Sequence, residues 1–310
     1  LTKGLVSTGC NVEDIGLCLS PTIYFSQFDL NCDAVAMITA SHNENGWTGI
    51  KMGIQKGLTH CYEEMKELKE IVLNKKFEIG NGTYKKIDNY KSKYIKHLSK
   101  NKINKQLKVV AACGNGTAGI FAPEILRNIG CEVIELNCEP EGNFTRGTEP
   151  LPENLMDLRN MVKRHHADVG FAIDPDADRL AIVSETGEPL GEEYTIVIAA
   201  DGYLNEMKQS ENFVLNLSSS LALEKLAESR GSSVIRSAVG EINVVNKMNE
   251  VNSNLGGEGN GGVILRECHL GRDSLVGVTL ILNRMSQTND PLSVIYQSLP
   301  QFIIVKDKIN

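Results

Sequence analysis

Short apolar runs alternate with longer amphipathic stretches along almost the whole chain. The short runs are rich in Val, Ile and Ala and predict β-strands, whereas the longer stretches repeat apolar residues with helical spacing. The predicted strands are Ala34–Thr39, Lys108–Cys113, Glu132–Leu136, Val169–Ile173, Leu180–Ser184, Phe213–Leu217 and Ser233–Ala238. The predicted helices are Tyr62–Leu73, Ala118–Asn128, Glu153–His165, Leu221–Ser229 and Ser274–Met285.

Strands separated by helices of this length predict βαβ units, and therefore an α/β fold with parallel or mixed sheets. A chain of 310 residues is longer than one typical domain. A lysine- and asparagine-rich stretch, Lys91–Lys105, and a turn-rich stretch, Thr186–Glu193, mark two breaks. We therefore predict three similar α/β domains over residues 1–104, 105–190 and 191–310.

Composition narrows the class of protein. Hydrophobic residues make up 41% and charged residues 23%, which is typical of a globular protein with buried cores. The net charge of −7 argues against a general nucleic-acid binder, but not against a phosphorylated small-molecule ligand. The chain lacks a long apolar run and a recognisable signal peptide, so we expect no membrane span and a cytoplasmic location. Its eight cysteines form no C-x-x-C pair, and we expect reduced thiols, several of them buried.

The run Ile173–Arg179, IDPDADR, combines three aspartates and an arginine within seven residues. Three carboxylates at alternate positions follow an apolar strand, where α/β sheets place their ligands. They would repel one another unless a divalent cation binds, and hard oxygen ligands favour Mg²⁺. Arg179 adds a fixed cation suited to a phosphate oxygen. The alternative is an acidic surface turn in which Arg179 is a solvated partner.

A second candidate loop is TASHNENGWTGIKMG, Thr39–Gly53, which follows a predicted strand. It places Ser41 just beyond the end of that strand. A serine hydroxyl is a weak nucleophile without a base or an electrophile, and His42 and Lys51 are nearby candidates. From local sequence alone, Ser41 is equally compatible with a simple turn or helix-capping residue.

Two glycine-rich segments complete the candidates. Glu258 and Asn260 are the only hydrogen-bonding side chains of GGEGNGG, Gly256–Gly262, and they suit the vicinal hydroxyls of a sugar. The alternative there is a bulged hairpin. The segment Gly114–Gly119, GNGTAG, follows a strand and precedes a helix, with Glu135 about twenty residues on. This pattern satisfies a dinucleotide-binding fingerprint and would indicate an oxidoreductase.

Three of these motifs, in this order, resemble the α-D-phosphohexomutases from one end of the chain to the other. TASHNENGWTGIKMG resembles the phosphoserine loop of that family, IDPDADR its magnesium loop and GGEGNGG its sugar-recognition loop. The family has four domains. The resemblance implies that this chain is a fragment without the first strand of domain 1 and without domain 4. In that interpretation GNGTAG is simply the first turn of domain 2.

The resemblance also implies roles for individual residues. Ser41 would carry the phosphoryl group, Lys51 would be the general acid/base if neighbouring cations lower its pKa, and Arg179 would steady the phosphate beside His42. The implied Mg²⁺ ligands are Ser41, Asp174, Asp176 and Asp178. The residues implied to bind substrate are Asn43, Gly240, Glu241, Glu258 and Asn260.

The implied reaction moves phosphate between O1 and O6 of a hexose or hexosamine phosphate, through phosphoserine and a bisphosphorylated sugar. A hexose 1,6-bisphosphate would be the activator, a sugar phosphate the partner, and a homodimer is compatible with the resemblance. Glu44 stands where the family usually has proline, and the sugar loop ends in Gly-Gly where many members have Ser-Gly-His. Members with this glycine-rich form are phosphoglucosamine mutases or dual phosphomannomutase/phosphoglucomutases, and we favour the former. The alternatives are an NAD(P)-dependent oxidoreductase and a non-catalytic module that binds sugar phosphates.

Overall fold

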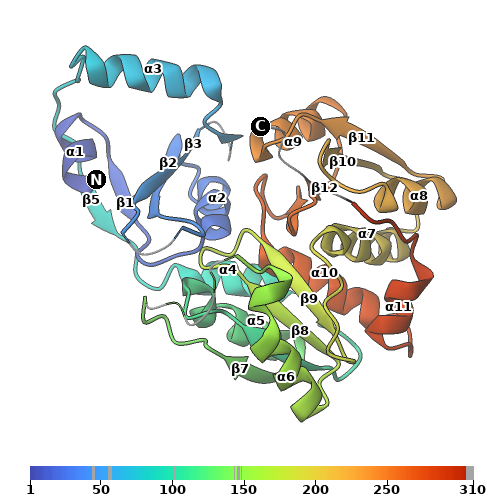
Figure 1. The fold of residues 1–310 in the computed structure, drawn as a ribbon. Coiled ribbons are helices and arrows are strands. Elements are labelled where there is room, and N and C mark those ends of the chain that lie inside the picture. The colour runs from blue at the N-terminus through green and yellow to red at the C-terminus, as the bar shows by residue number, and fades with distance from the viewer. Residues whose placement is uncertain are drawn as a thin grey trace.

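The computed structural model describes residues 1–43, 46–54, 58–100, 102–142, 144, 147 and 149–304, with nothing said of the Leu58 side chain. It shows three consecutive α/β parts that meet at a common centre (Figure 1). Sheets with both parallel and antiparallel pairs confirm the predicted fold class.

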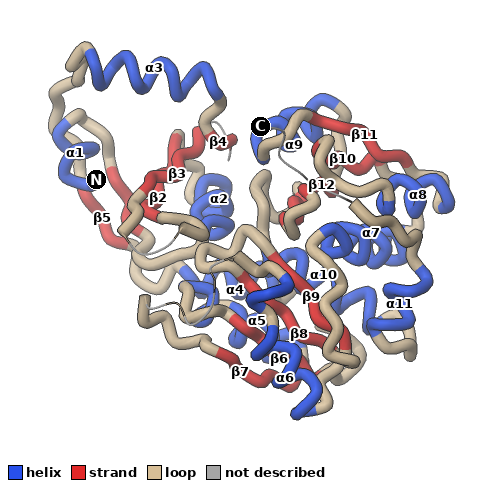
Figure 2. Tube along the Cα trace, viewed as in Figure 1, coloured by secondary structure: helices blue, strands red, loops and turns tan. Residues whose placement is uncertain are grey.

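The first part holds two small sheets, one of two strands and one of three, with helices beside them (Figure 2). Strands β2 and β3 form an antiparallel hairpin extended by β4, while β1 pairs with β5 in parallel. Its elements are α1 (Thr2–Ser7), β1 (Val12–Asp14), α2 (Ser20–Asp29), β2 (Ala34–Thr39), β3 (Gly49–Ile54), β4 (Leu58–Thr59), α3 (Tyr62–Leu73) and β5 (Tyr84–Lys86).

The second part is a four-stranded sheet in the order β7-β6-β8-β9, with β9 antiparallel to the rest. Strands β6, β8 and β9 are largely apolar and buried because helices cover the sheet, whereas the edge strand β7 carries two exposed glutamates. Its elements are α4 (Lys91–Leu98), β6 (Lys108–Ala112), η1 (Thr117–Ile120), α5 (Ala122–Ile129), β7 (Glu132–Leu136), η2 (Pro152–Asn154), α6 (Met156–His165), β8 (Val169–Ile173) and β9 (Leu180–Ser184).

The third part repeats this topology in the order β11-β10-β12-β13, again with an antiparallel last strand. Helix α10 packs against α7, the most extensively buried helix of this part. Its elements are α7 (Glu193–Met207), β10 (Asn212–Asn216), α8 (Ala222–Ser229), β11 (Ser233–Ser237), α9 (Glu241–Glu250), β12 (Leu255–Glu258), β13 (Gly262–Leu265), α10 (Ser274–Ser286) and α11 (Leu292–Ser298).

The three candidate loops occupy equivalent places in these sheets. Each connects the two strands of an antiparallel hairpin: β2 to β3 for the serine loop, β8 to β9 for the aspartate loop and β12 to β13 for the glycine-rich loop. The hairpin that was one alternative for Gly256–Gly262 is therefore present. It is also what brings Glu258 to the end of β12.

The segment Lys91–Lys105, predicted from the sequence to separate two domains, is helical over its first eight residues. Residues 91–98 form α4, in which Tyr94 and Ile95 are buried among the lysines. The ring of Tyr94 packs on Phe25 of α2 and on Phe121, with centroids 5.6 and 6.1 Å apart. Helix α4 thus contributes Tyr94 and Ile95 to the hydrophobic core that joins the parts of the chain.

No disulfide joins any of the eight cysteines, all of which lie in the described part of the chain. Five of them are buried: Cys18, Cys113, Cys131, Cys138 and Cys268.

Among the described residues, no helix combines the length and apolarity needed to cross a membrane.

Candidate active site

The aspartate loop is built by its own backbone. Asp174 accepts hydrogen bonds at Oδ1 from the amides of Asp178 and Arg179, at 2.9 and 3.0 Å, which closes the loop between β8 and β9. Ala177 takes a left-handed conformation with φ of 63°, a strained geometry for a residue with a Cβ. The three aspartates are at most 3% exposed, so the acidic surface turn considered from sequence is excluded.

Each carboxylate has at least one oxygen bound to protein neighbours, and Asp174 and Asp178 each have a second oxygen without a hydrogen bond among the described residues. Asp176 Oδ2 accepts from Ser20 Oγ at 2.9 Å, and Asp178 Oδ2 faces Arg272 Nη2 at 2.8 Å. Asp174 Oδ2 and Asp178 Oδ1 are buried without a hydrogen-bond partner among the described residues. One carboxylate oxygen from each of the three residues can be chosen so that all lie within 4.8 Å of one another. Buried oxygens of this kind fit a hard divalent cation such as Mg²⁺.

Ser41 lies beside the remaining oxygen of this set. Its Oγ is 3.5 Å from Asp176 Oδ1 and 3.3 Å from His42 Nδ1. The residue has a φ of 53°, and its amide donates to Thr39 Oγ1 at 2.9 Å. Thr39 Oγ1 in turn lies 3.3 Å from Asp176 Oδ2, so the end of β2 ties the serine to the aspartate loop.

Lys51 projects from β3 into the same cluster. Its Nζ lies 2.7 Å from Asp176 Oδ2 and 2.8 Å from Asp178 Oδ2, and it donates to Ser20 Oγ at 3.0 Å. Burial alone would lower the pKa of Lys51, but the charges of Asp178 and Asp176 more than offset it, and the pKa is raised. The expectation that cations lower this pKa is therefore wrong, because the groups around Nζ are carboxylates.

The pKa values of Asp174 and Asp178 are shifted in opposite directions by the charges around them. Burial and the neighbouring charges of Asp178 and Asp176 hold the pKa of Asp174 well above its ordinary value. For Asp178, burial acts in the same direction, yet Arg272 and Lys51 outweigh it and its pKa is lowered. The two carboxylates therefore differ because the cations of the site lie beside Asp178.

Arg179 and His42 converge on a residue that the sequence analysis did not select. Arg179 Nη1 donates to Glu149 Oε1 at 2.5 Å, and His42 Nε2 lies 3.6 Å from the same oxygen. The Nε of Arg179 is buried without a hydrogen bond among the described residues, 3.9 Å from Asp178 Oδ1. Arg179 of the aspartate loop and His42, next to Ser41, thus meet at one oxygen of Glu149.

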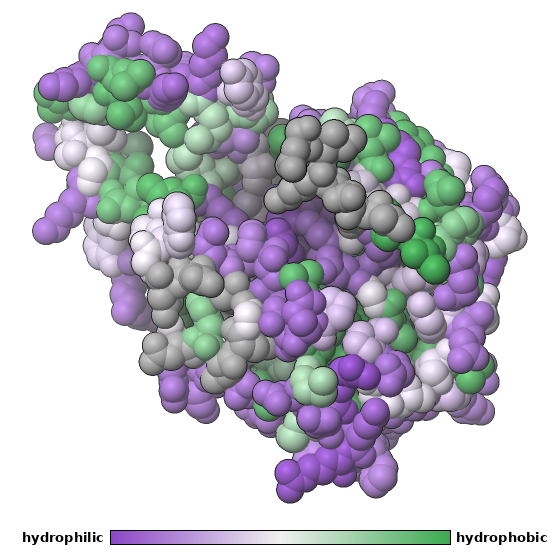
Figure 3. All heavy atoms as spheres, in the orientation of Figure 1, coloured by the Kyte–Doolittle hydropathy of each residue, from purple (hydrophilic) through white to green (hydrophobic). Residues whose placement is uncertain are grey.

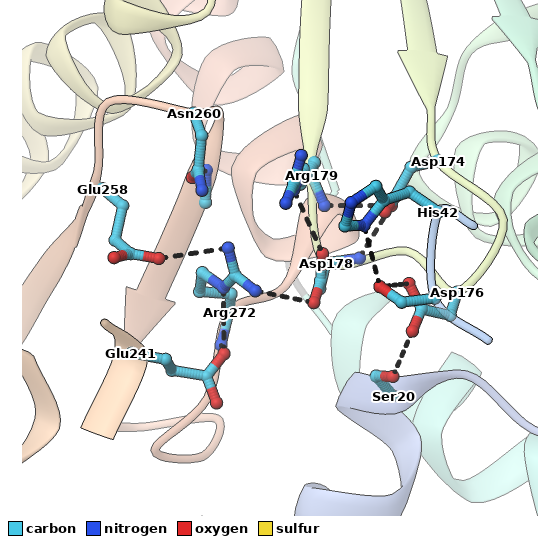
Figure 4. A network of polar contacts seen from close by, with 12 residues as sticks. Ser20, His42, Asp174, Asp176, Asp178, Arg179, Glu241, Glu258, Asn260 and Arg272 are labelled. Carbon is cyan, nitrogen blue, oxygen red and sulfur yellow. Dashed lines mark hydrogen bonds and ion pairs between the residues drawn. The ribbon is translucent and has the colours of Figure 1, made fainter. Parts of the chain in front are cut away.

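The glycine-rich loop holds Glu258 at the end of β12. Its Oε1 accepts from Asn216 Nδ2 at 2.8 Å and from the Gly240 amide at 3.2 Å, and its Oε2 pairs with Arg272 Nη1 at 3.0 Å. Glu241, at the start of α9, accepts from Arg272 Nε at 3.0 Å. Figure 4 shows Arg272 between Asp178 on one side and Glu258 and Glu241 on the other.

Two predicted site residues hydrogen-bond within their own turns. Asn43 Nδ2 donates to Ala40 O at 2.8 Å and is exposed, while Asn260 Oδ1 accepts from the Gly262 amide at 3.3 Å. Glu44, noted above for replacing a proline, lies outside the described residues.

Sequence reasoning did not select four residues that complete this network: Ser20, Thr39, Glu149 and Arg272. Ser20 is 156 positions from Asp176 and Arg272 is 94 from Asp178. No local motif links such positions. The residue after Arg272 has a structural role: Asp273 caps α10, because its Oδ1 accepts hydrogen bonds from the amides of Leu275 and Val276.

The dinucleotide fingerprint finds no support in the geometry of GNGTAG. The amides that would cradle a pyrophosphate donate within the protein: Asn115 to Asn137 O, Gly116 to Cys113 O and Thr117 to Pro175 O. A Cβ on Gly116 would lie 2.7 Å from Pro175 Cα. The glycine therefore permits close packing on the aspartate loop.

Taken together, the fold and the site define a class: a multidomain α/β protein with a buried three-aspartate cluster beside a serine, between cationic side chains. In Figure 3 the surface between the first and third parts of the chain is largely hydrophilic. Comparison with known proteins agrees with that class. Models of phosphoglucomutase/phosphomannomutase alpha/beta/alpha domains I, II and III match residues 1–79, 92–187 and 191–302.

Individual relatives and a solved structure give the same result. The chain is 34% identical to a phosphoglucomutase/phosphomannomutase of Thermococcus kodakarensis and 31% identical to a probable phosphoglucosamine mutase of Methanopyrus kandleri. Each match covers 99% of this chain and 69% of the relative. A phosphoglucomutase/phosphomannomutase family protein of Burkholderia thailandensis superimposes with a TM-score of 0.89 at 26% identity, covering 97% of this chain and 68% of that one. The chain belongs to the phosphoglucomutase/phosphomannomutase family, with domains I to III represented in it.

Proposed function

We propose that this chain forms the catalytic part of a phosphohexomutase that moves phosphate between O6 and O1 of a hexosamine or hexose phosphate. The observation that carries the proposal is the buried aspartate cluster with Ser41 at its side: Ser41 Oγ lies 3.5 Å from Asp176 Oδ1, and the other two aspartates each keep a buried oxygen without a hydrogen bond among the described residues. This arrangement suits a metal-assisted phosphoserine. Family membership supports it, because the relatives named above are mutases of sugar phosphates.

In this proposal Asp174, Asp176 and Asp178 would hold Mg²⁺ together with an oxygen of phosphorylated Ser41. The bound ion would neutralise charge on the phosphoryl oxygens. Arg179 and His42 both lie beside Glu149 Oε1 and would contact those oxygens. These two side chains would orient the phosphoryl group of Ser41 for in-line transfer.

The transfer has a defined balance of bonds and protons. The P–O bond to Ser41 breaks as the free sugar hydroxyl forms a new P–O bond, giving a bisphosphorylated sugar. We propose that Lys51, protonated among carboxylates, gives a proton as the Ser41 hydroxyl is regenerated and takes up the proton of the sugar hydroxyl. The sugar then turns, and its other phosphate returns to Ser41, so a hexose 1,6-bisphosphate would also charge the enzyme.

For the sugar itself we propose glucosamine phosphate, with mannose and glucose phosphates as the alternatives. Relatives at similar identity carry both kinds of name. Glu258 in the sugar loop and Glu241 at the start of α9 lie beside each other around Arg272 and would accept hydrogen bonds from substrate hydroxyls.

The test is ³¹P NMR of the 6-phosphates of glucosamine, mannose and glucose with Mg²⁺ and catalytic glucose 1,6-bisphosphate. We expect a 1-phosphate resonance to grow fastest with glucosamine 6-phosphate, and no growth with Ser41→Ala. Binding of these sugars without any transfer would instead support the non-catalytic module and contradict the proposal.

A further inference from the structure

Arg272 forms ion pairs with three carboxylates that come from three separate segments. It lies between β13 and α10, and its side chain is 14% exposed. Nη2 pairs with Asp178 of the aspartate loop at 2.8 Å, Nη1 with Glu258 at 3.0 Å and Nε with Glu241 at 3.0 Å (Figure 4). Every guanidinium nitrogen therefore serves a different acid.

This arrangement requires arginine. The planar guanidinium directs its donors along fixed, divergent directions, whereas a lysine ammonium is a single point charge. Burial would lower the pKa of Arg272, but Asp178, Glu241 and Glu258 outweigh it, and the pKa is raised. The side chain is a permanent cation among three acids.

The glycine-rich loop is shaped around this arginine. A Cβ on Gly262 would lie 2.4 Å from Arg272 Cδ, so a side chain at this position would displace the arginine. The glycine at the end of the sugar loop and the arginine thus pack as a unit. This gives the last glycine of the loop, Gly262, a physical reason.

We propose that Arg272 is a positioning residue that sets Glu258 and Glu241 for sugar binding while it holds Asp178 Oδ2, linking sugar recognition to the aspartate loop. The inference rests on the proposed function. Without the guanidinium, the buried carboxylates of Asp178 and Glu258 and the partly buried carboxylate of Glu241 would face one another and turn apart by like-charge repulsion. Glu258 would keep only its contacts with Asn216 and the Gly240 amide.

The experiment measures the rate at which glucose 1,6-bisphosphate phosphorylates Ser41 in the presence of Mg²⁺, as the concentration of the bisphosphate is varied. We expect Arg272→Gln to raise the half-saturating concentration by about tenfold or more while the maximal rate falls by less than about threefold. Arg272→Lys keeps a positive charge but should also raise the half-saturating concentration, because one ammonium group cannot pair with three carboxylates in divergent directions.

Two comparisons separate positioning from general stability. Arg284→Gln is the matched control, since Arg284 is also 14% exposed and pairs with buried Asp201, on α7 and outside the site. It should leave the half-saturating concentration unchanged at a similar loss of thermal stability. If Arg272 acts through Glu258, the double variant Arg272→Gln/Glu258→Gln should be no worse than the poorer single variant.

The outcomes separate this inference from the proposed function. If Arg272→Gln and Arg284→Gln behave alike, or if the Arg272 and Glu258 effects simply add, the positioning role is wrong and the mutase proposal stands. If wild-type Ser41 accepts no phosphate at any sugar concentration, the proposed function fails and this inference fails with it.

Discussion

At the scale of single residues, the site combines charges that destabilise one another in the absence of a ligand. Asp174 is fully buried, has an oxygen without a hydrogen bond among the described residues, and has a raised pKa. Such a group costs folding free energy that a bound cation would recover. Binding capacity and stability are therefore opposed at this position.

We predict that Asp174→Asn unfolds at the same or a higher temperature than wild type without Mg²⁺. The amide keeps an oxygen to accept the Asp178 and Arg179 amides and removes one of three repelling charges. With saturating Mg²⁺ the order should reverse, because only wild type gains binding free energy, about 2.7 kcal/mol at a hundred times the Kd. Differential scanning calorimetry with and without Mg²⁺ measures both orders, and equal Mg²⁺ stabilisation of the two proteins would contradict the metal site.

At the scale of secondary-structure elements, α4 ties together regions far apart in the sequence. Tyr94 contacts rings from α2 and from the turn before α5, and its hydroxyl donates to Asp273 Oδ2, the cap of α10, at 2.6 Å. His269 Nε2 lies 3.0 Å from the same oxygen. A hydrogen bond from a buried donor to a charged acceptor contributes more than an ordinary one.

Tyr94→Phe should therefore lower the free energy of unfolding by about 2 kcal/mol. Tyr90→Phe is the matched control on the same segment, since its hydroxyl bonds to the more exposed Asp29 at 3.0 Å. Urea denaturation should give a clearly smaller loss for Tyr90→Phe. Equal losses of unfolding free energy in the two variants would mean that the hydrogen bond from Tyr94 to Asp273 gives no extra stability.

Elements with a strong local pattern could be predicted from the sequence, and others could not. Strands β8 and β9 and helix α3 have the predicted ends, because uninterrupted apolar runs and helical spacing are local signals. Helix α2 was not predicted since it is buried on nearly all sides and has no polar face to reveal its period. Strand β3 was missed because Gly49 and Lys51 interrupt its pattern.

The same division holds for the site. Each loop was identified from its own residues, and the structure brings Ser41, Lys51 and the three aspartates together. The partners that orient these groups, Ser20 and Arg272, come from distant segments. Only the folded chain shows that Lys51 is surrounded by acids, which reverses the direction expected for its pKa.

At the scale of the whole molecule, the three domains meet on the aspartate loop. Lys51 reaches it from the first domain, and Arg272 reaches it from the third. The backbone adds a contact, in which the Ser274 amide at the start of α10 donates to Ala177 O at 3.0 Å. A ligand bound at this loop should therefore stabilise the contacting segments of all three domains.

Hydrogen–deuterium exchange should show this coupling. We expect Mg²⁺ with a sugar phosphate to slow exchange by roughly threefold or more in residues 39–43, 174–179 and 256–273. Helix α3, which has no buried residue and lies away from the centre in Figure 1, is the internal control and should not change. Protection confined to residues 174–179 would contradict the coupling.

The central claim is that Ser41 carries the phosphoryl group, and phosphopeptide mass mapping tests it most directly. The chain would be analysed before and after incubation with glucose 1,6-bisphosphate and Mg²⁺, beside Ser41→Ala. We predict phosphate on Ser41 that increases with the bisphosphate, requires Mg²⁺ and is absent from the variant. An unmodified Ser41 under every condition, or phosphate on another residue that persists in Ser41→Ala, would contradict the assignment.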